Sequence, residues 1–407
     1  MASVSSLLAG ISGIGRDQTR GGYSRPVYST AELDLRSWFV SEAQLRGLDV
    51  RTDRNGIIWA WWGPEQDDSL VTGSHLDSVP GGGAFDGPLG VAAALAAVDE
   101  LKTRGVTPGD GARSLAVTVF PEEEGSRFGI ACLGSRLLSG AIDADKARNL
   151  RDADGNSFAE LSAQNGINPE FLGTDPEALA RIGQFIELHV EQGKGLIDLD
   201  GAGSSWPTAI GGAVLGHGRW KFAIRGQGNH AGTTLMADRA DPMVAAAQIV
   251  LAAQKVAAEQ PEARATVGRI VPIPGGTNVI ASSVELWLDA RHPDDAVTAA
   301  VVQKIHGKAQ IAAANEGCSV FLTEESLSPT VGFDVGLQRR LMELLPGSPV
   351  LDTGAGYDAG IFSSLVPAGM VFIRNPSGIS HSPEEAVEDA DADLSAKALA
   401  DVLEGLL

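Results

Sequence analysis

The chain has 407 residues, of which 43% are hydrophobic and 20% are charged. This composition is typical of a globular protein with one large or two unequal domains, and it excludes a disordered or fibrous chain. The 52 acidic and 31 basic residues give a formal net charge of -21, which repels phosphate backbones and anionic lipid, so we expect no nucleic acid and no membrane as a partner.

The cysteines and the N-terminal segment indicate the compartment. Cys132 and Cys318 lie far apart in the sequence and do not form the disulfide framework of a small secreted domain. The first residues contain a short apolar run without a basic segment ahead of it, which is neither a signal peptide nor a membrane span. We therefore expect a reducing, cytoplasmic location, and we expect this run to begin the first helix.

Local signals predict a helix and a hairpin near the start of the chain. Ser29 and Glu32 have the spacing of a capping box ahead of an apolar pattern, which predicts a helix over 31–46. Residues 48–62 then alternate around an Asn-Gly pair at 55–56, and such a pair is a strong signal for a β-hairpin.

A strand, helix and strand follow in the order of a βαβ unit. Two short apolar runs that predict buried strands flank a segment with helical spacing, and a third apolar run comes later. The predicted elements are the strand 69–73, the helix 88–105, the strand 114–120 and the strand 184–190. Parallel strands of this kind end at one edge of their sheet, where ligand sites form.

The pattern changes between about 208 and 326. We expect, in order, a glycine-rich hairpin at 210–226, a helix at 242–259, strands at 264–272 and 278–291, a helix at 293–315 and a strand at 319–324. A four-stranded antiparallel sheet with two helices, as in a ferredoxin-like domain, fits this order. The first pattern then resumes with a helix at 335–344, a strand at 370–374 and a last helix from about 391.

The predicted fold is therefore α/β. A mostly parallel sheet with helices on both faces is formed by residues 1–208 and 327–407. An α+β ferredoxin-like domain, residues 209–326, is inserted into it.

Three of the seven histidines lie in polar loops that follow strands, namely His75, His189 and His381. Carboxylates lie close to each of them in the sequence: Asp77, Asp86, Glu191, Glu384 and Glu385. Imidazole and carboxylate together suit zinc, manganese, cobalt or nickel rather than calcium. Two cations roughly 3.5 to 4 Å apart need a bridging carboxylate and one or two further ligands each, which three His with an Asp and a Glu provide.

Each of these residues alone has an ordinary structural explanation. A single histidine after a strand is commonly a hydrogen-bonded structural residue, Asp86 among glycines suits a turn, and the run Glu122-Glu123-Glu124 suits a solvated acidic turn. The recurrence at three strand ends favours a metal site, because buried carboxylates need positive charge. Within the acidic run, one side chain would bind metal and a neighbour would transfer protons.

Several sequence blocks, in this order, match one known family. They are GSHLDSVPGGGAFDGPLGV (73–91), EEEGSRFG (122–129), ELHVEQG (187–193), GNHAGTTLMADRADP (228–242), TNVIASSVELWLDAR (277–291), GAGYDAG (354–360) and GISHSPEE (378–385). On these blocks the chain resembles the N-carbamoyl-L-amino-acid hydrolases, β-ureidopropionases and allantoate amidohydrolases. These are dinuclear metallohydrolases whose fold is shared with aminoacylases and carboxypeptidase-type enzymes.

The resemblance implies two divalent metal ions per subunit. Their ligands would be His75, Asp86, Glu124, His189 and His381, with Asp86 as the bridging carboxylate. It also implies that Glu123 is the proton-transfer carboxylate. Asp77 would orient a ligand imidazole from outside the ligand set.

The resemblance also implies contacts with a small carboxylate substrate. Gln192 would contact a ureido group, and His230 would reach into the partner subunit's site and stabilise an oxyanion. Asn278 and Arg291 would hold the substrate carboxylate. Gly356 and Tyr357 would line the substrate site. We therefore expect a homodimer with shared active sites, in which the inserted domain serves as a lid and a dimerisation surface.

The implied activity is hydrolysis of a linear C–N bond in an N-carbamoyl-L-amino acid or an allantoate-like ureido acid. Two alternatives stay open, namely an amidase or aminoacylase that acts on a non-ureido N-acyl compound, and a metal-free binding protein without catalysis. Two positions depart from the family pattern, which has histidine in place of Tyr357 and proline in place of Leu235. Because phenol carries no imidazolium charge, the contact near Tyr357 is expected to differ.

Overall fold

The computed structural model describes residues 2–109, 113–200 and 206–407. It divides into two compact units, the first formed by the chain up to Ala213 together with Gly332–Leu407 and the second by Val214–Val331. These limits lie a few residues beyond the limits of 208 and 327 expected from the sequence. No helix among the described residues has the length and apolarity needed to cross a membrane.

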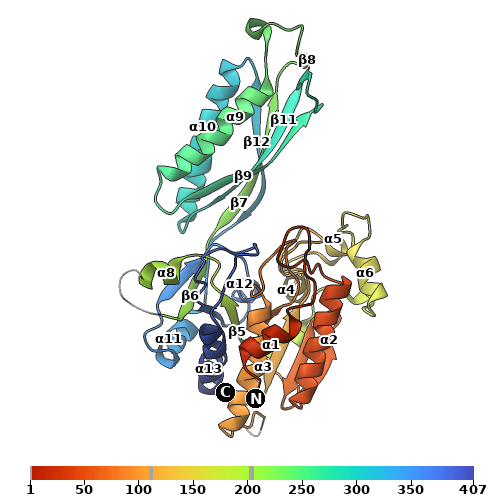
Figure 1. The fold of residues 1–407 in the computed structure, drawn as a ribbon, viewed down its shortest axis with the longest axis vertical. Helices are drawn as coiled ribbons and strands as arrows, with labels where there is room; N and C mark the ends of the chain where they lie inside the picture. The colour runs from red at the N-terminus through yellow and green to blue at the C-terminus, as the bar shows by residue number, and fades with distance from the viewer. Residues whose placement is uncertain (1, 110–112, 201–205) are drawn as a thin grey trace. The chain divides into compact units, whose positions relative to one another are not determined.

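A mixed sheet runs through the first unit (Figure 1). Within the described residues its strands follow the order β1-β2-β4-β3-β5-β15-β6-β13, and β14 pairs with β6. The central strands β4, β3, β5 and β15 are parallel to one another, whereas β2 and β6 pair antiparallel with their neighbours. The bounds are β1 Asp49–Thr52, β2 Ile58–Trp62, β3 Ser69–His75, β4 Leu115–Phe120, β5 Ile182–Val190, β6 Thr208–Val214, β13 Val331–Gly332, β14 Val350–Thr353 and β15 Ala368–Ile373.

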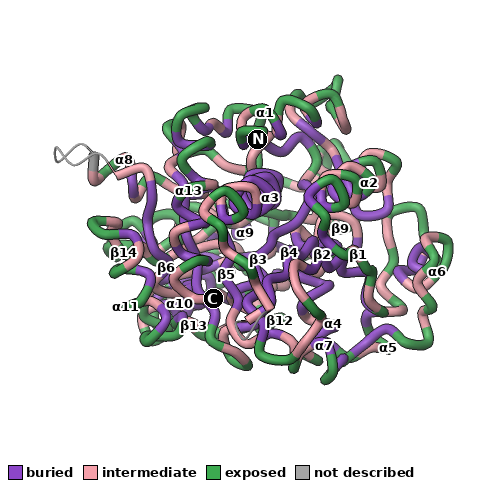
Figure 2. Tube along the Cα trace, turned by 90° about the horizontal axis from the view of Figure 1, so that it is seen from below, coloured by how far each residue is buried: buried purple, intermediate pink, exposed green. Residues whose placement is uncertain are grey.

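Helices pack on both faces of this sheet. Along β5, Ile186 and Leu188 belong to the core that includes α1, α3 and α13, whereas the alternate residue Phe185 packs against Phe362 of α12. Figure 2 shows most of α3 and the strand β3 buried. The helices are α1 Val4–Ile11, α2 Thr30–Leu45, α3 Pro88–Thr103, α4 Leu133–Ser139, α5 Ala144–Arg148, α6 Phe158–Gln164, η1 Pro169–Phe171, α7 Pro176–Ala180, α8 Gly195–Asp200, α11 Val335–Leu344, α12 Asp358–Phe362 and α13 Asp389–Leu406.

The local predictions for this unit are confirmed. The Ser29 side chain accepts a hydrogen bond from the Glu32 amide at the start of α2, and β1 and β2 pair as an antiparallel hairpin. Helix α3 connects the parallel neighbours β3 and β4. Gly90 lets α3 approach the sheet, because a Cβ there would lie 2.2 Å from the carbonyl oxygen of Leu188.

The second unit contains an antiparallel sheet in the order β12-β7-β11-β9. With its two long helices, it has the element order and strand order of a ferredoxin-like fold. Alternate residues of β11, among them Val284, Leu286 and Leu288, form a core with α9 and α10. The bounds are β7 His217–Arg225, β8 Asn229–His230, η2 Met236–Asp238, α9 Pro242–Ala258, β9 Arg264–Ile273, β10 Val279–Ile280, β11 Ser283–Arg291, α10 Asp295–Asn315 and β12 Ser319–Ser328.

The predicted hairpin at 210–226 is wrong. Strand β6 pairs with β15 of the first sheet, with Ile210 opposite Val371. Strand β7 pairs instead with β11 and β12 of the second sheet. Two strands that follow one another closely along the chain therefore belong to different sheets. The glycine residues between them indicate a turn but do not show which strands pair.

One buried ion pair joins α2 to the hairpin. The Arg36 guanidinium contacts the Glu32 carboxylate and donates to the Gly56 carbonyl oxygen at 2.8 Å. The second Glu32 oxygen accepts from the Tyr28 amide at 2.9 Å. Glu32 is 1% exposed and Arg36 is 9% exposed, so neither charge is compensated by water.

We expect Glu32→Ala to lower the free energy of unfolding by about 3–5 kcal/mol, because it leaves a buried guanidinium without its carboxylate. Urea denaturation measures this change. The matched control is Asp34→Ala on the exposed side of the same helix, which should change stability by less than about 0.5 kcal/mol. Equal effects of the two substitutions would contradict the importance of the pair.

Candidate functional site

The first group of candidate ligands surrounds one oxygen of Asp86. The Nε2 atoms of His75 and His189 lie 3.4 and 3.3 Å from Asp86 Oδ1, and 3.5 Å from each other. His75 ends β3, His189 lies near the end of β5, and Asp86 lies in the loop that leads into α3. All three are buried. Because β3 and β5 are parallel neighbours, their carboxyl ends bring the two histidines together.

The second group surrounds the other oxygen of the same carboxylate. His381 Nε2 lies 3.6 Å from Asp86 Oδ2 and 3.2 Å from Glu124 Oε2. In each group the candidate ligand atoms all lie within 4.8 Å of one another. Asp86 is the residue that the two groups share, which is the arrangement of a carboxylate that bridges two cations.

Backbone carbonyl groups orient two of the imidazoles. Nδ1 of His75 lies 3.0 Å from the Asp77 carbonyl oxygen, and Nδ1 of His189 lies 2.9 Å from the Val190 carbonyl oxygen. An N–H at Nδ1 satisfies these contacts and leaves Nε2 with a lone pair toward Asp86. Both rings are thus held in the tautomer that binds a metal through Nε2.

The role expected for the Asp77 carboxylate needs correction. Its oxygen lies 3.8 Å from His75 Nδ1, beyond hydrogen-bond distance. The two carboxylate oxygens instead accept from the Glu123 and Glu124 amides at 3.2 and 3.1 Å. Asp77 therefore orients His75 through its main chain and holds the acidic loop with its side chain.

The acidic run places its three side chains in different surroundings. Glu122 is fully buried and accepts from the Arg127 amide at 3.0 Å, so it stabilises the following turn. Burial raises the pKa of Glu122 to about 8. Glu124 contacts His381, whereas Glu123 Oε2 faces the first group, 3.6 Å from His75 Nε2. This geometry fits Glu124 as a ligand and Glu123 as a free carboxylate, roles that stay predictions.

The electrostatics of the cluster favour positive charge at its centre. Burial opposes the imidazolium form of His75, but Glu123 and Asp86 raise its pKa well above the usual value. The hydrogen bond with Glu124 raises the pKa of His381 to about 9. Burial disfavours ionised Asp86, yet His189 and His75 hold its pKa well below the usual range. The negative charge of these buried carboxylates raises the pKa of the neighbouring imidazoles. The same negative charge would favour bound divalent cations.

Two predicted substrate contacts adjoin the ligand groups: Gln192 lies beside the second group, and Tyr357 contacts both Gln192 and the His189 ring of the first group. The Gln192 amide nitrogen donates to Asp86 Oδ2 at 2.6 Å, and its oxygen accepts from the Tyr357 hydroxyl at 2.8 Å. Tyr357 is buried and packs edge-on to the His189 ring. Gly356 precedes it, and a Cβ at Gly356 would meet no atom within 4 Å.

Glu385 is a residue near the site whose role sequence reasoning missed. One of its carboxylate oxygens accepts from the amides of Phe85 and Asp86 at 2.9 and 3.0 Å. It thereby ties the loop that carries Asp86 to the loop that carries His381. The sequence shows that Glu385 lies four residues after His381, but it does not show that the side chain turns toward the loop of Asp86. Glu191, which lies beside His189 in the sequence, accepts from the Leu196 amide at 3.0 Å at the start of α8.

The remaining predicted residues lie in the second unit. His230 on β8 is exposed, and β8 pairs with β10 directly beside Asn278, whose carbonyl oxygen accepts from the Ala231 amide at 3.0 Å. Arg291 is the last residue of β11, and its guanidinium forms a two-point contact with Asp289 at 2.7 and 2.9 Å. The structure thus brings His230 and Asn278 together and places Arg291 at the far end of β11.

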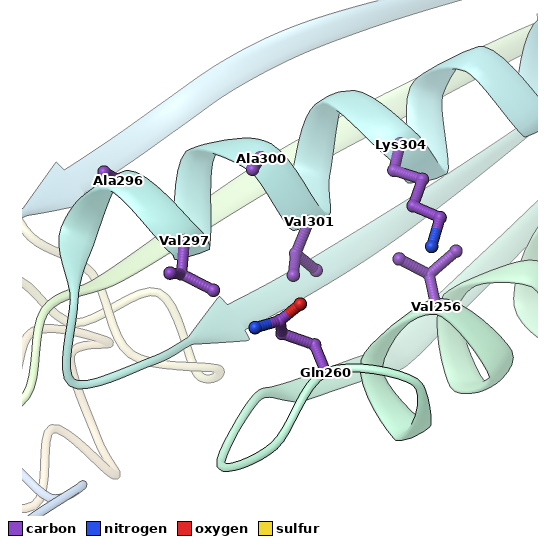
Figure 3. A pocket seen from close by; sticks show the side chains of 7 residues that line it. All are labelled: Val256, Gln260, Ala296, Val297, Ala300, Val301 and Lys304. Carbon is purple, nitrogen blue, oxygen red and sulfur yellow. The ribbon is translucent and has the colours of Figure 1, made fainter.

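The second unit also has a shallow groove between α9 and α10 (Figure 3). It encloses about 240 Å³ and is lined by residues such as Val256, Gln260, Val301 and Lys304. No histidine, cysteine or carboxylate is among its lining residues. The groove therefore lacks the ligands of a metal site, and Lys304 is its only ionisable lining residue, so the candidate site is the cluster around Asp86.

The parallel sheet and the shared aspartate define an α/β protein with a candidate two-cation centre. The chain matches the model of Peptidase family M20/M25/M40 over residues 71–405, and it belongs to that family. This finding, together with the relatives described next, confirms the resemblance inferred from the sequence blocks.

Three similar proteins show which members of the family this chain resembles. An N-carbamoyl-L-amino acid amidohydrolase from Geobacillus stearothermophilus is 35% identical over 391 residues, which cover 94% of this chain and 93% of that protein. An allantoate amidohydrolase from Escherichia coli K12 is 32% identical over 405 residues, covering 98% and 96%. A crystal structure of an amidase of the hydantoinase/carbamoylase family from Burkholderia vietnamiensis has a TM-score of 0.84 at 27% identity, covering 99% and 96%.

We expect Asp86→Asn to weaken binding of both cations, because a neutral amide cannot offer an anionic oxygen to each group. The loss in affinity should exceed the roughly 10- to 100-fold typical of a lost outer contact. Elemental analysis after dialysis against a graded chelator measures it. The control Glu191→Gln, two residues after His189 and outside both ligand groups, should keep the wild-type metal content. Retention of metal by Asp86→Asn would contradict the shared role of this carboxylate.

Proposed function

We propose that this chain is a metal-dependent amidohydrolase that cleaves a ureido C–N bond in a small carboxylate substrate. N-carbamoyl-L-amino acids and allantoate-like ureido acids are the substrate class, in keeping with the names of the relatives above. The observation that carries the proposal is the Asp86 carboxylate, shared by two ligand groups beside the buried carboxylate of Glu123.

The donor set fits two divalent cations such as zinc, manganese, cobalt or nickel. His75, His189 and Asp86 Oδ1 would hold one, and His381, Glu124 and Asp86 Oδ2 would hold the other. Bound there, the cations would supply Lewis-acid activation of the scissile carbonyl group and of the attacking water.

Glu123 is the proposed proton-transfer residue. Its Oε2 faces the ligand cluster, while Oε1 accepts a hydrogen bond from the Cys132 thiol at 3.3 Å. Burial raises the pKa of Glu123 well above its usual value, although His75 opposes this shift. A basic carboxylate in this position can take a proton from water and deliver it to the leaving nitrogen. For an N-carbamoyl substrate the products are ammonia, carbon dioxide and the free amino acid.

The second unit is proposed as the lid and dimerisation domain, supported by where its predicted substrate residues lie. His230 and Asn278 lie near the Ser283 end of β11, and Arg291 lies at the other end of this nine-residue strand. At the usual rise per residue the strand spans about 25 Å, far more than an amino-acid-sized substrate. One copy of this unit therefore cannot bring all three to one substrate, so we propose that a second copy supplies His230 and Asn278.

Within this proposal Arg291 holds the substrate carboxylate and His230 donates to the developing oxyanion. A guanidinium suits a carboxylate because it offers two parallel N–H donors. The contact between Arg291 and Asp289 shows such a two-point geometry with a carboxylate of the chain itself. A donor aimed at the oxyanion contributes most when water is excluded, which closure of the second unit would achieve.

Glu123→Gln should lower kcat for N-carbamoyl amino acids by on the order of 10²- to 10⁴-fold, because the amide cannot accept the proton. Its metal content should equal that of the wild type, since Glu123 lies outside both ligand groups. Ammonia release from N-carbamoyl amino acids and allantoate measures the activity.

Amine release from N-acetyl and N-formyl analogues, assayed beside ammonia release, tests the non-ureido alternative. Wild-type protein with full metal content that releases no ammonia from any ureido compound would overturn the proposed substrate class. Loss of metal from Glu123→Gln would instead overturn the proton-transfer assignment.

Mixing two inactive variants tests the shared active site. His230→Ala and Arg291→Ala should each be nearly inactive, because each lacks one contribution to every site. After subunit exchange in equal amounts, half of the dimers should be mixed, with one intact site each. Activity should then return to about a quarter of the wild-type value.

The control is each variant exchanged with itself, which should stay inactive. No recovery in a mixture that native mass spectrometry shows to contain mixed dimers would contradict sharing between subunits.

A further inference from the structure

A chain of hydrogen bonds runs from β14 to the shared aspartate. The Thr353 hydroxyl lies 3.5 Å from the Tyr357 hydroxyl, which donates to Gln192 Oε1 at 2.8 Å. The Gln192 amide nitrogen then donates to Asp86 Oδ2 at 2.6 Å. The same nitrogen lies 3.1 Å from Ser380 Oγ and 3.2 Å from His381 Nε2. The Gln192 amide thus spans the distance between the phenol and the second ligand group.

Packing holds the Tyr357 hydroxyl in place. Tyr357 is 2% exposed, and its ring lies edge-on to His189 with centroids 4.9 Å apart. Its other neighbour, Phe372 of β15, lies at 5.9 Å. A buried ring between two rings has little freedom to reorient, so the fold sets the position of its hydroxyl oxygen.

Both ends of the Gln192 amide select one orientation. The reverse orientation would place the amide oxygen against the Asp86 carboxylate, where two acceptors repel each other. It would also remove the acceptor for the Tyr357 hydroxyl. Leaving a buried donor unpaired costs about 1–3 kcal/mol. The amide nitrogen therefore faces the ligand cluster, and the amide oxygen faces Tyr357.

We propose that Tyr357 is a positioning residue that determines specificity, because its hydroxyl fixes Gln192 with the NH₂ group toward the substrate. This inference rests on the proposed function. The fixed amide offers a donor, so the substrate group that Gln192 recognises must carry a lone pair. The carbonyl oxygen of a ureido or acyl group meets this requirement, whereas the terminal NH₂ of a ureido group does not.

A consequence for substrate choice follows. Carbamoyl and formyl groups share the carbonyl oxygen and differ in the terminal NH₂, which a formyl group lacks. A donor-only Gln192 therefore does not distinguish them. Cations bound at Asp86 would neutralise its carboxylate, so in the metal-loaded protein the Tyr357 hydroxyl is the contact that selects the amide orientation. Its removal lets the amide turn, and the amide oxygen can then accept from the terminal NH₂ of a carbamoyl group.

The test measures binding to the metal-loaded Glu123→Gln variant, in which turnover is suppressed. Calorimetry gives dissociation constants for the N-carbamoyl and N-formyl derivatives of one amino acid, with and without Tyr357→Phe. With Tyr357 present the two constants should agree within about threefold, and Tyr357→Phe should shift their ratio toward the carbamoyl compound by at least about threefold, the value of one neutral hydrogen bond. An unchanged ratio would overturn the specificity role.

Tyr23→Phe is the matched control. Tyr23 is also buried, and its hydroxyl donates to the Ser12 carbonyl oxygen at 3.1 Å, with no contact to either ligand group. Its loss removes a comparable phenol hydrogen bond and should leave the ratio of dissociation constants unchanged. A shift equal to that of Tyr357→Phe would show that the effect is general and would overturn the proposal.

A substrate-free readout separates this inference from the proposed function. The side-chain NH₂ signals of Gln192, identified in nuclear magnetic resonance spectra by their absence in Gln192→Ala, should exchange slowly with solvent in the wild type and faster in Tyr357→Phe. Unchanged exchange would overturn the positioning role. If exchange changes but neither compound binds, the substrate class is wrong, and with it the specificity role, while the positioning role stands.

Discussion

The structure of the site depends on one buried carboxylate that faces positive charge on two sides. Asp86 is 4% exposed and has an imidazole near each of its oxygens. A carboxylate so far from water is costly unless cations or hydrogen-bond donors compensate it. The three histidines and the Gln192 amide supply this compensation. Glu385 is itself a carboxylate, and it instead fixes the backbone of the loop. The charge of Asp86 therefore determines which side chains surround it, and Glu123, the proposed proton-transfer residue, lies beside this cluster.

The supporting contacts explain why a loop residue can serve as this centre. Asp86 lies between β3 and α3, and loops between elements are mobile unless tied down. Here Glu385 binds the loop backbone, and Asp77 binds the backbone of the neighbouring acidic loop. Gly87 leaves room for the His75 ring, since a Cβ there would lie 2.6 Å from it. Such contacts hold reacting groups to the small tolerances that catalysis needs.

In the second unit, the residues proposed to contact the substrate lie farther apart than one small substrate can span. His230 and Asn278 share the short β8–β10 ribbon, whereas Arg291 ends the strand that the ribbon leads into. An extended strand separates its ends by a fixed rise per residue. The separation follows from the fold of this unit by itself, and it gives the proposed exchange of residues between subunits a geometric basis.

The sequence by itself determined the features of the structure that depend on residues close together in the chain. The capping residues of α2, the Asn-Gly hairpin, the βαβ order and the recurrence of histidine and acid after strands are local features with direct physical causes. Only the tertiary structure decided which sheet β6 joins, which way Glu122 and Glu123 point, and that Asp77 orients His75 through its main chain. It also revealed that Glu385 fixes the loop of Asp86. Those outcomes depend on pairing and side-chain direction between segments far apart in the chain, which sequence spacing does not encode.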